Sequence, residues 1–381
     1  MTVKMRIPFN KPYLTGVEMT YMAEAHKLGQ LAGDGHFTEA CSRYLATSLE
    51  ASRVLLTTSA TAALDMAALL LDIRAGDEVI LPSYTFVSTA NAFVLRGAVP
   101  VFVDIRDDTF NLDERKIEQA LTSRTRAIVP VHYAGVSCEM DSIMGIAERI
   151  GVPVVEDAAQ AIGSTYKGRP LGSIGDFGCL SFHETKNVMC GEGGALILRD
   201  QQNVLRAEIV REKGTDRSRF FRGEVDRYTW VDMGSSFLPG ELLAAFLWAQ
   251  LSDATSIIKR RLSIWDRYRV ELTSLEEEGR VRLPRIPEDC QHNGHIFHML
   301  MPSERERDRF IKLMRERGIG CVTHYVPLHS SPMGRRVGRI SGDMRVTDSV
   351  SNRLVRLPIW LGIEEHQDEV IEAIWDFFGS R

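Results

Sequence analysis

The sequence predicts an α/β protein with a large domain built on a mostly parallel sheet and a smaller α/β domain at its C-terminal end. From about residue 52, short runs rich in valine and isoleucine alternate with longer segments of helical pattern, which is typical of βαβ units. After about residue 251, a long, charged, amphipathic segment opens a second series of elements. We therefore expect a large domain at residues 1–254, with an N-terminal arm, and a small domain at residues 255–381.

The strands expected in the large domain are short and apolar, as buried parallel strands are. They lie at RVLLTT (53–58), DEVILPS (77–83), VPVFVDI (99–105), RAIVPVH (126–132), VPVVED (152–157) and CLSF (179–182). Helices are expected at 61–73, 86–97, 113–122, 139–150 and 240–251. Because ligands of parallel sheets bind beyond the carboxyl ends of the strands, the residues that follow each strand are the candidates for a site.

The small domain is expected to begin with the long charged helix, which Gly279 ends. A strand at HIFHMLM (295–301), a helix at 303–318 with Ser303 as its N-cap, a strand at CVTHYV (321–326) and a helix at 364–378 follow. Strands and helices thus alternate here as well, which predicts a second α/β unit.

The composition limits the partners and the compartment. The chain has 381 residues, 44% of them hydrophobic, a net charge of −5 and no basic block suited to nucleic acid. It shows no secretory leader and no run of about 18 apolar residues, so we expect no membrane association. The six cysteines are scattered without a C-x-x-C pair, which favours reduced thiols and a cytoplasmic location.

The first strand end is followed by small residues that could hold a phosphate. In LLTTSATAAL (55–64) a strand runs into Ser59, and a helix begins near Ala60 and Thr61. The free N–H groups of a helix N-terminus bind phosphate, and small side chains let the backbone come close. Taken alone, the stretch is better explained as an ordinary turn with Ser59 as the cap, and it lacks the G-x-x-x-x-G-K-[ST] pattern.

A carboxylate ends another expected strand. In VPVVEDAAQA the strand runs into Glu156 and Asp157, and Gln160 follows two small residues later. A buried carboxylate is costly without a partner, and a protonated ring nitrogen would be one. A helix N-cap aspartate is an equally good explanation of the residue in isolation.

Lys186 follows a third strand end, in SFHETKNVMCGEGGA (181–195), where Ser181 and His183 precede it. A lysine in a pocket can have a lowered pKa and form a Schiff base, although most lysines are solvated and inert. A fourth strand end, LPSYTFVST, carries Tyr84 and Phe86, either of which could cover a flat ring or simply pack in the core.

Together these four strand ends meet the needs of one cofactor, pyridoxal phosphate. Its sites combine a phosphate cradle, a carboxylate opposite the pyridinium nitrogen, a stacking aromatic ring and a Schiff-base lysine. We interpret Asp157 as the partner of the ring nitrogen. Lys186 would then carry the cofactor and move a proton during the reaction.

At these residues the sequence resembles the DegT/StrS-type sugar-nucleotide aminotransferases, which are pyridoxal-phosphate enzymes of fold type I. The blocks that carry the resemblance run along essentially the whole chain: IPFNKP, GDGHFT, PSYTFVSTANAFVLRGAVPVFVDI, VPVHYAG, VVEDAAQ, FHETKN, GEGGA and HYVPLH. Some members of the family are dehydratases in which histidine replaces the lysine. The presence of Lys186 argues against that reaction.

The resemblance implies roles for individual residues. Lys186 would carry the cofactor, Asp157 would face the ring nitrogen, Gln160 would lie near the ring, and Phe86 would stack on it, with Tyr84 the weaker candidate. The phosphate would be held by Ser59, Ala60, Thr61 and Ser181. The family's active site is shared across a homodimer, and a G-x-N segment of the neighbour reaches the phosphate. Here that segment reads GSS, so Ser236 stands where asparagine is usual.

The substrates implied by the resemblance are anionic. L-glutamate would give its amino group to dTDP-4-dehydro-6-deoxy-D-glucose, yielding dTDP-4-amino-4,6-dideoxy-D-galactose and 2-oxoglutarate. The loop REKGTDRSRFFRG could supply the cations that bind these anionic substrates, and Arg219 is its strongest candidate. A solvated charged turn explains the loop nearly as well. Tyr84, His324, Tyr325 and His329 could border the sugar. No third ligand clusters with the two histidines, so we expect no metal.

Two other functions remain open from the sequence. The first is a 3-aminotransferase that acts on a dTDP-3-keto-6-deoxysugar, because residue types do not reveal how the ring is turned in the pocket. The second is a regulatory protein that binds pyridoxal phosphate without turnover. The joint presence of Lys186, Asp157 and Gln160 speaks against the second alternative.

Overall fold

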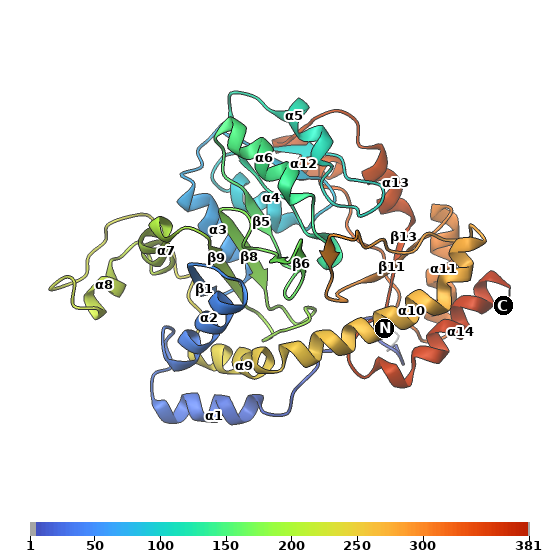
Figure 1. Ribbon diagram of the computed structural model, residues 1–381, viewed down its shortest axis with the longest axis horizontal. Helices are drawn as coiled ribbons and strands as arrows, with labels where there is room; N and C mark the ends of the chain where they lie inside the picture. Colours follow the sequence, from blue (N-terminus) through green and yellow to red (C-terminus); the bar gives the residue numbers. More distant parts are fainter. Residues whose placement is uncertain (1–4, 380–381) are drawn as a thin grey trace.

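The computed structural model describes residues 5–379, and a central sheet in two four-stranded halves dominates it (Figure 1). One half has the order β12 (Arg339–Ile340), β3 (Val99–Val103), β2 (Glu78–Pro82), β4 (Thr125–Ile128). The other has the order β5 (Val155–Asp157), β8 (Phe177–Ser181), β9 (Gly194–Leu198), β1 (Arg53–Thr57). Parallel bridges from Ile128 to Val154 and from Val131 to Asp157 join the two halves.

The pairing in this sheet is mostly parallel, as the sequence predicts. The strands β12, β3, β2 and β4 are parallel to their neighbours, and β5 is parallel to β8. Within the described part of the sheet, β9 alone runs against its neighbours, β8 and β1. The carboxyl ends of β1, β2, β5 and β8 therefore lie along one edge of the sheet, where the four candidate segments begin.

Successive side chains of a strand point to opposite faces of the sheet. A layer of helices packs on each of the two faces. Ile80 belongs to an apolar cluster with α2 (His36–Ser48), α6 (Met140–Ile150) and α9 (Glu241–Ser252). Its neighbours Val79 and Leu81 belong to a second cluster with α3 (Ala60–Leu70), α4 (Val87–Val94) and α7 (Val204–Arg211). Since β2 is buried along its whole length, both faces are core, as the short apolar strands predict.

The C-terminal part has an apolar core of its own (Figure 1, right). The elements of this C-terminal part are α10 (Ala254–Glu277), the antiparallel pair β11 (Phe297–Leu300) and β13 (Leu354–Leu357), α11 (Glu304–Glu316), α13 (Arg345–Arg353) and α14 (Gln367–Phe378). Ser303 caps α11 as expected, since its Oγ accepts a hydrogen bond from the Glu306 N–H at 3.2 Å. The division between residues 254 and 255 stays a prediction.

Several contacts tie this C-terminal part to the rest of the chain, and two of them involve backbone pairing. β12 adds to the edge of the large sheet beside β3. There Arg339 donates two hydrogen bonds to Glu78, at 2.6 and 3.1 Å, and with Arg124 lowers the pKa of that buried carboxyl to about 2. At the other end of the chain, Ile7 forms a parallel bridge with Ile319 and lies in the C-terminal core.

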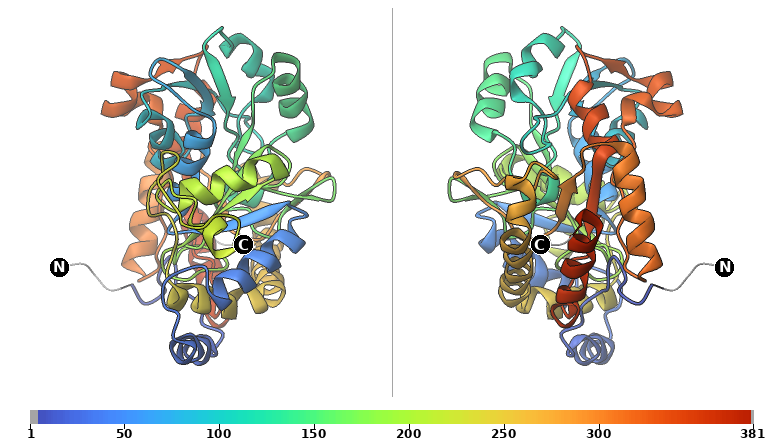
Figure 2. Two further views of the ribbon diagram at one scale, coloured as in Figure 1. Left: turned by 90° about the vertical axis from the view of Figure 1, so that its left-hand side faces the viewer. Right: turned by 90° about the vertical axis from the view of Figure 1, so that its right-hand side faces the viewer.

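The remaining elements lie around this frame. They are α1 (Glu18–Leu28), α5 (Ile117–Ala120), α8 (Arg217–Phe221), α12 (Pro332–Val337), the hairpin β6 (Thr165–Tyr166) and β7 (Arg169–Pro170), and β10 (Cys290–Gln291), which pairs with β6. Figure 2 shows α1 at the outer edge of the molecule, packed beyond α9. Among the described residues, no helix combines the length and the apolar character needed to cross a membrane.

Two expected elements differ in the structure. The helix expected at 113–122 is a short 3-10 turn followed by α5, because Leu121 adopts extended backbone and the Thr125 side chain takes the Thr122 N–H. The strand expected at 321–326 is a single bridge between Val322 and Arg356. The chain leaves this pairing at Tyr325, whose φ of 27° is incompatible with a strand.

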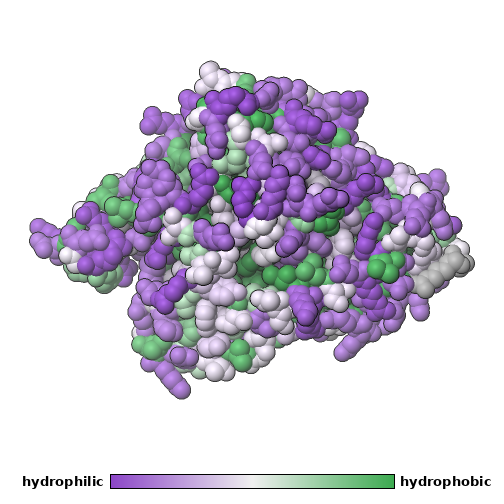
Figure 3. Space-filling view, viewed as in Figure 1, coloured by the Kyte–Doolittle hydropathy of each residue, from purple (hydrophilic) through white to green (hydrophobic). Residues whose placement is uncertain are grey.

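The segment around α8 projects from the body of the molecule (Figure 1, left). It carries exposed aromatic side chains: Phe221 is 69% exposed, Tyr228 is 50% exposed and Trp230 is 77% exposed. The space-filling view in Figure 3 shows apolar and hydrophilic residues mixed on this projection. Such an exposed aromatic patch is characteristic of an interaction surface.

Candidate active site

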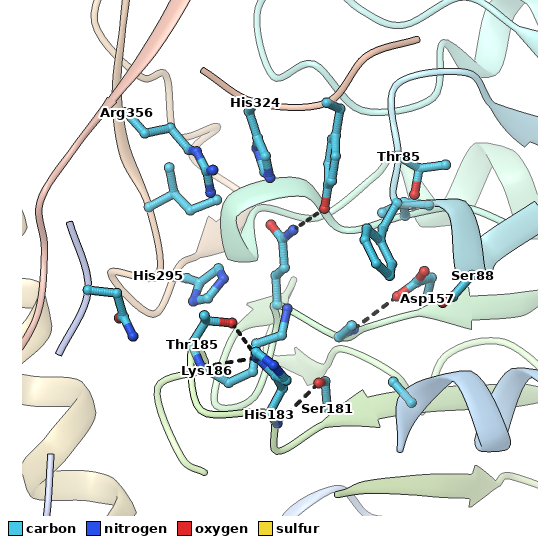
Figure 4. A pocket seen from close by; sticks show the side chains of 18 of the residues that line it. Thr85, Ser88, Asp157, Ser181, His183, Thr185, Lys186, His295, His324 and Arg356 are labelled. Carbon is cyan, nitrogen blue, oxygen red and sulfur yellow. Dashed lines mark hydrogen bonds between the residues drawn. The ribbon is translucent and has the colours of Figure 1, made fainter. Parts of the chain in front are cut away.

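A cavity of about 470 Å³ opens at the carboxyl ends of the strands, between the large sheet and the C-terminal part (Figure 4). Its volume is in the range of small-molecule sites. The cavity brings together most of the residues that the sequence singles out: Ser59, Ala60, Thr61, Phe86, Asp157, Gln160, Ser181, Lys186, His324 and Tyr325.

The turn from β1 into α3 forms one end of the cavity. Ser59 is the N-cap of α3, and its Oγ accepts a hydrogen bond from the Ala62 N–H at 3.1 Å. Gly194 of the neighbouring strand lies against this turn, where a Cβ atom would come within 2.3 Å of the Ser59 carbonyl carbon and 2.4 Å of the Ala60 nitrogen. The turn and the glycine therefore fit together only without a side chain at position 194.

Asp157 ends β5 and is 6% exposed. Its Oδ2 accepts a hydrogen bond from Thr89 Oγ1 at 2.7 Å, and its Oδ1 accepts one from the Ala159 N–H at 3.2 Å. The adjacent Glu156 points to the other face of the sheet. There it accepts hydrogen bonds from His132 and from the backbone of the loop that follows β7. Of these two carboxylates, only Asp157 lines the cavity.

Lys186 lies in the loop that connects β8 to β9. The base of the loop is closed by hydrogen bonds from the Phe182 N–H to the Gly193 carbonyl and from the Cys190 N–H to the Phe182 carbonyl, both 2.8 Å. In Figure 4 the Lys186 side chain rises into the cavity between His295 and Asp157. Burial lowers its pKa from 10.5 to about 8, while the charge of Asp157 opposes this shift and that of Arg356 adds to it.

Gln160 connects the large sheet to the C-terminal part. The Ala134 N–H can only donate, so it fixes Oε1 of Gln160, 2.7 Å away, as the acceptor. Gln160 Nε2 then donates to Tyr325 Oη at 2.9 Å. The Tyr325 ring stacks on His324, whose Nδ1 lies 2.8 Å from Tyr133 Oη. These contacts fix two side chains over the cavity.

The two aromatic candidates after β2 differ in position. Phe86 precedes α4, lines the cavity and is 56% exposed. Tyr84 is 1% exposed and lies one layer behind the wall, where its ring packs on Tyr133 and Tyr325. A ring ligand in the cavity can therefore contact Phe86, whereas Tyr84 supports the residues that form the wall.

Besides Tyr84, three residues that the sequence singles out lie outside this cavity. His329 is buried, with its Nδ1 2.7 Å from Ser83 Oγ. Arg219 is in α8 on the projection and pairs with Glu224 at 3.1 Å. Ser236 is exposed in the segment that returns from the projection. The structure therefore separates these three residues from the other candidates within one chain.

Three further residues line the cavity although they belong to none of the sequence motifs that predict the site. Arg261 of α10 is 4% exposed, donates to the carbonyls of Gly294 and His295, and has its pKa lowered to about 10 by burial. Arg356 of β13 and His295 also line the cavity. In the sequence, Arg356 reads as an ordinary strand residue in RLVRLPIW, so no signal there singles it out.

The protonation state of His295 follows from its neighbours. The Asn187 side chain donates from Nδ2 to the Asn293 carbonyl at 2.8 Å, so its Oδ1 faces His295 Nδ1 at 2.9 Å. Nδ1 must then carry the hydrogen, and Nε2 is left as an acceptor. Burial lowers the pKa of His295 well below 6.5, which keeps the ring neutral.

The fold and this site together define a pyridoxal-phosphate enzyme. The cavity offers a helix N-terminus that a glycine leaves open, a buried carboxylate, an exposed aromatic ring and an amine of lowered pKa, which are the groups that this cofactor needs. The residues present therefore fit the cofactor.

Comparison with known proteins supports the same class. The profile of the DegT/DnrJ/EryC1/StrS aminotransferase family matches residues 12–375. The chain is 32% identical over 382 residues to the spore coat polysaccharide biosynthesis protein SpsC of Bacillus subtilis, covering 97% of this chain and 96% of SpsC. The chain belongs to the DegT/DnrJ/EryC1/StrS aminotransferase family.

Solved structures agree over nearly the whole chain. The putative sugar aminotransferase Spr1654 from Streptococcus pneumoniae, in its PLP-form, is 28% identical with a TM-score of 0.89, covering 97% of this chain and 98% of that one. DesV from S. venezuelae is 31% identical with a TM-score of 0.86, covering 96% of this chain and 95% of that one. The predicted fold, enzyme class and cofactor are confirmed: the protein is a pyridoxal-phosphate-dependent aminotransferase of fold type I.

Proposed function

We propose that this enzyme transfers the amino group of L-glutamate to dTDP-4-dehydro-6-deoxy-D-glucose. The products are dTDP-4-amino-4,6-dideoxy-D-galactose and 2-oxoglutarate. The observation that carries the proposal is that the Lys186 amine and the Asp157 carboxylate face one cavity beyond neighbouring strands. A sugar substrate is supported by the names of relatives, since Spr1654 is called a putative sugar aminotransferase. The nucleotide, position 4 and the galacto configuration rest on the sequence resemblance.

Lys186 is the proposed catalytic residue. When bound, pyridoxal phosphate supplies an aldehyde that takes up an amino group and a ring that withdraws electrons from the adjoining carbon. With a pKa of about 8, about one tenth of the Lys186 side chains are neutral at pH 7, so the amine can act as a nucleophile. The free amine also accepts the proton from Cα of the donor and delivers one to the sugar carbon that receives nitrogen.

Asp157 is proposed to hold the proton of the ring nitrogen by accepting a hydrogen bond from it. The hydrogen bonds from the Thr89 hydroxyl and the Ala159 N–H fix the orientation of this carboxylate. At the β1–α3 turn, the N–H groups of Ala60 and Thr61 and the hydroxyls of Ser59 and Ser181 are proposed to bind the phosphate.

The wall residues are proposed to orient the rings. Phe86 stacks on the cofactor ring and Gln160 contacts it, which their positions in the cavity support. His324 and Tyr325 contact the sugar. Tyr84 and His329 do not line the cavity. Tyr84 packs on Tyr325, so for Tyr84 we propose that it acts on the sugar through that ring. For His329, whose Nδ1 lies 2.7 Å from Ser83 Oγ, the role at the sugar site stays a proposal from the sequence resemblance.

A homodimer with shared active sites belongs to the same proposal. Arg219 and Ser236 lie on and beside a projecting segment with exposed aromatic side chains, which supports their entry into the cavity of a second copy. We also propose a cytoplasmic location. It is supported by the cysteines, which are all buried and unpaired.

The experiment that tests this function is an assay with a panel of dTDP-ketosugars and L-glutamate. The structure of each amino sugar is then determined by NMR. Amination at C4 with an axial amine is the expected result, and amination at C3 would establish the alternative 3-aminotransferase. Single-turnover absorbance with glutamate alone separates an enzyme from a regulatory protein, because a binding protein without turnover would leave the cofactor spectrum unchanged.

A further inference from the structure

His295 carries a hydrogen-bond acceptor that none of the described residues uses. The residue precedes β11, is 8% exposed and lines the cavity. Its Nδ1 carries the hydrogen and donates it to Asn187 Oδ1, 2.9 Å away, so Nε2 keeps a lone pair. Within residues 5–379 no hydrogen bond engages Nε2. Because a buried acceptor without a donor is costly, this nitrogen is suited to a donor on a ligand.

The hydrogen bonds that fix this tautomer join three segments of the chain. Asn187 is 5% exposed and donates from Nδ2 to the Asn293 carbonyl at 2.8 Å. A flipped Asn187 amide would set its oxygen against that carbonyl oxygen. Asn293, which is fully buried, donates to the carbonyls of Gln160 and Ile162 at 2.8 and 2.9 Å, and its Oδ1 accepts the His295 N–H at 3.1 Å. The imidazole is therefore held in one tautomer and one position.

The charges around the ring keep it neutral. Burial lowers the pKa of His295 well below 6.5, and the positive charges of Lys186, Arg261 and Arg356 add to this shift. In the described part of the chain, no carboxylate forms an ion pair with His295. The lone pair on Nε2 therefore persists at neutral pH. It repels a carboxylate or phosphate oxygen and favours an O–H or N–H donor.

The position of the ring restricts which donor it meets. His295 is close enough to Lys186 for the charge of the amine to act on it, and Figure 4 shows the two side chains next to each other. Lys186 is proposed to act on the carbon that loses or gains nitrogen, so a ligand group beside that carbon is the one within reach of Nε2. In an α-amino acid the groups next to that carbon are a carboxylate and a methylene, and neither donates. In a ketohexose a carbon next to the carbonyl carries a hydroxyl group.

We propose that His295 accepts a hydrogen bond from the hydroxyl group next to the carbonyl carbon of the sugar, which is the C3 hydroxyl of a 4-ketohexose. His295 thereby selects ketosugars that keep this hydroxyl over 3-deoxy ketosugars, and Asn187 is the positioning residue that sets its tautomer. This inference rests on the proposed function, because it names the part of the sugar that the cavity recognises.

The first test measures binding to the holoenzyme without turnover. Calorimetry compares dTDP-6-deoxy-D-galactose, which has no carbonyl to aminate, with the same nucleotide sugar lacking the C3 hydroxyl. The wild-type chain should bind the 3-deoxy ligand about 10-fold more weakly, because one buried hydrogen bond is lost. In His295→Asn the shorter amide still donates to Asn187 but does not reach the position of Nε2. The two ligands should then bind alike.

Three further variants separate recognition from structure. His295→Gln extends an amide oxygen toward the position of Nε2 and should restore a preference of about threefold. Asn187→Asp keeps the imidazole but sets a carboxylate on Nδ1, which favours the doubly protonated ring, so the preference should disappear. His298→Asn is the matched control, since His298 is 4% exposed, has its pKa lowered to about 3 by burial and does not line the cavity. It should keep the 10-fold preference.

A second readout uses the two half-reactions in single turnovers. With the ketosugar, kcat/KM of His295→Asn should fall by about 10-fold relative to the wild-type chain, and with the 3-deoxy ketosugar the two proteins should be alike. The half-reaction with glutamate should fall less than the half-reaction with the ketosugar, because glutamate offers no donor next to the reacting carbon.

Several outcomes would overturn the inference. Equal binding of the two ligands by the wild-type chain would leave the C3 hydroxyl without a partner, even if the ketosugar is aminated as proposed. A full preference in His295→Asn would assign the hydroxyl to another residue. Equal losses in both half-reactions would mean that His295 acts on Lys186 and not on the sugar. Failure of the proposed function has a different signature: the wild-type chain would aminate no dTDP-ketosugar, whatever the binding of the two unreactive ligands shows about His295.

Discussion

The two ends of the active-site cavity are built in different ways. The phosphate end is one continuous segment, the β1–α3 turn with Ser59 at its cap, closed by Gly194 from the adjacent strand. The opposite wall combines Phe9, His324 and Arg356 from segments far apart in the sequence. The first end depends on backbone groups that few substitutions can alter. The second depends on individual side chains, so it is the part of the site where specificity can change.

Replacement of Lys186 by alanine should have the largest effect, because it removes the proposed nucleophile between the two ends. We expect turnover to fall by about 10⁴-fold or more with the fold retained, since the side chain lies in an open cavity. Borohydride reduction followed by peptide mass analysis should show the cofactor on the wild-type peptide that contains Lys186 and on no peptide of the variant. Unchanged amino sugar formation would contradict the assignment.

Asp157→Asn should be the next most severe change. It keeps the size of the side chain but removes the charge proposed to hold the ring nitrogen protonated, so turnover should fall by about 10²- to 10³-fold. Thr89→Val is the companion variant, because it keeps the charge of Asp157 and removes the 2.7 Å hydrogen bond that orients the carboxylate, together with the 2.8 Å contact between the Thr89 and Thr85 hydroxyls. A smaller loss in Thr89→Val than in Asp157→Asn is expected. Equal losses would mean that orientation, and not charge, is what matters.

Gly194→Ala probes the backbone end alone. Its Cβ would lie 2.3 Å from the Ser59 carbonyl carbon, so the turn must shift, and we expect cofactor affinity to fall by about 10- to 100-fold. Gly145→Ala in α6 is the control, with no atom within 4 Å of its Cβ, and should stabilise the helix by about 0.5–1 kcal/mol. Equilibrium dialysis of cofactor and thermal unfolding separate the two effects. Full cofactor affinity in Gly194→Ala would argue against the phosphate site.

Gln160→Leu tests the link between the two ends. The variant leaves the Ala134 N–H and Tyr325 Oη without their partner, which should cost about 1–3 kcal/mol of stability. Because Tyr325 would lose its orientation over the cavity, KM for the ketosugar should rise by about 10-fold with kcat less affected. An unchanged KM would separate Tyr325 from the sugar.

The smallest expected effects are shifts in the pH midpoint of the rate at which the cofactor-free chain binds pyridoxal phosphate covalently. Capture needs the neutral amine of Lys186, so its rate should rise with pH and level off above about 8. Removal of the Arg356 charge in Arg356→Gln should move this midpoint up, and removal of the Asp157 charge in Asp157→Asn should move it down. His295 and His324 do not titrate in this range, because burial holds their pKa values well below 6.5. Stopped-flow absorbance across pH 6–10 measures both shifts.

The sequence predicted what depends on local pattern. Alternating short apolar strands and helices predicted the parallel sheet. Because parallel strands end at a common edge, the same pattern predicted that Ser59, Asp157 and Lys186 lie close together, and all three line the cavity. The order of strands and helices along the chain was enough to predict that these three residues lie together.

The rest of the site depends on contacts between distant segments. Arg356 is one alternating residue of a strand, and only the fold turns it toward the cavity beside Phe9. The loop arginines gave a stronger charge signal, yet they are engaged in ion pairs within the projection. Tyr84 follows a strand end as Phe86 does, but Tyr84 packs in the core, whereas Phe86 stands at the N-cap of α4 and is exposed in the cavity.

The edge strand β12 has a mechanical consequence. It crosses from the C-terminal part into the large sheet, where Arg339 and Ile340 pair with Val101 and Phe102, and Arg339 is held by Glu78. A hinge-like swing of the C-terminal part would have to strip this strand from the sheet and expose a buried charge. We therefore expect substrate entry without such a swing, so amide exchange in β12 should be as slow during turnover as at rest.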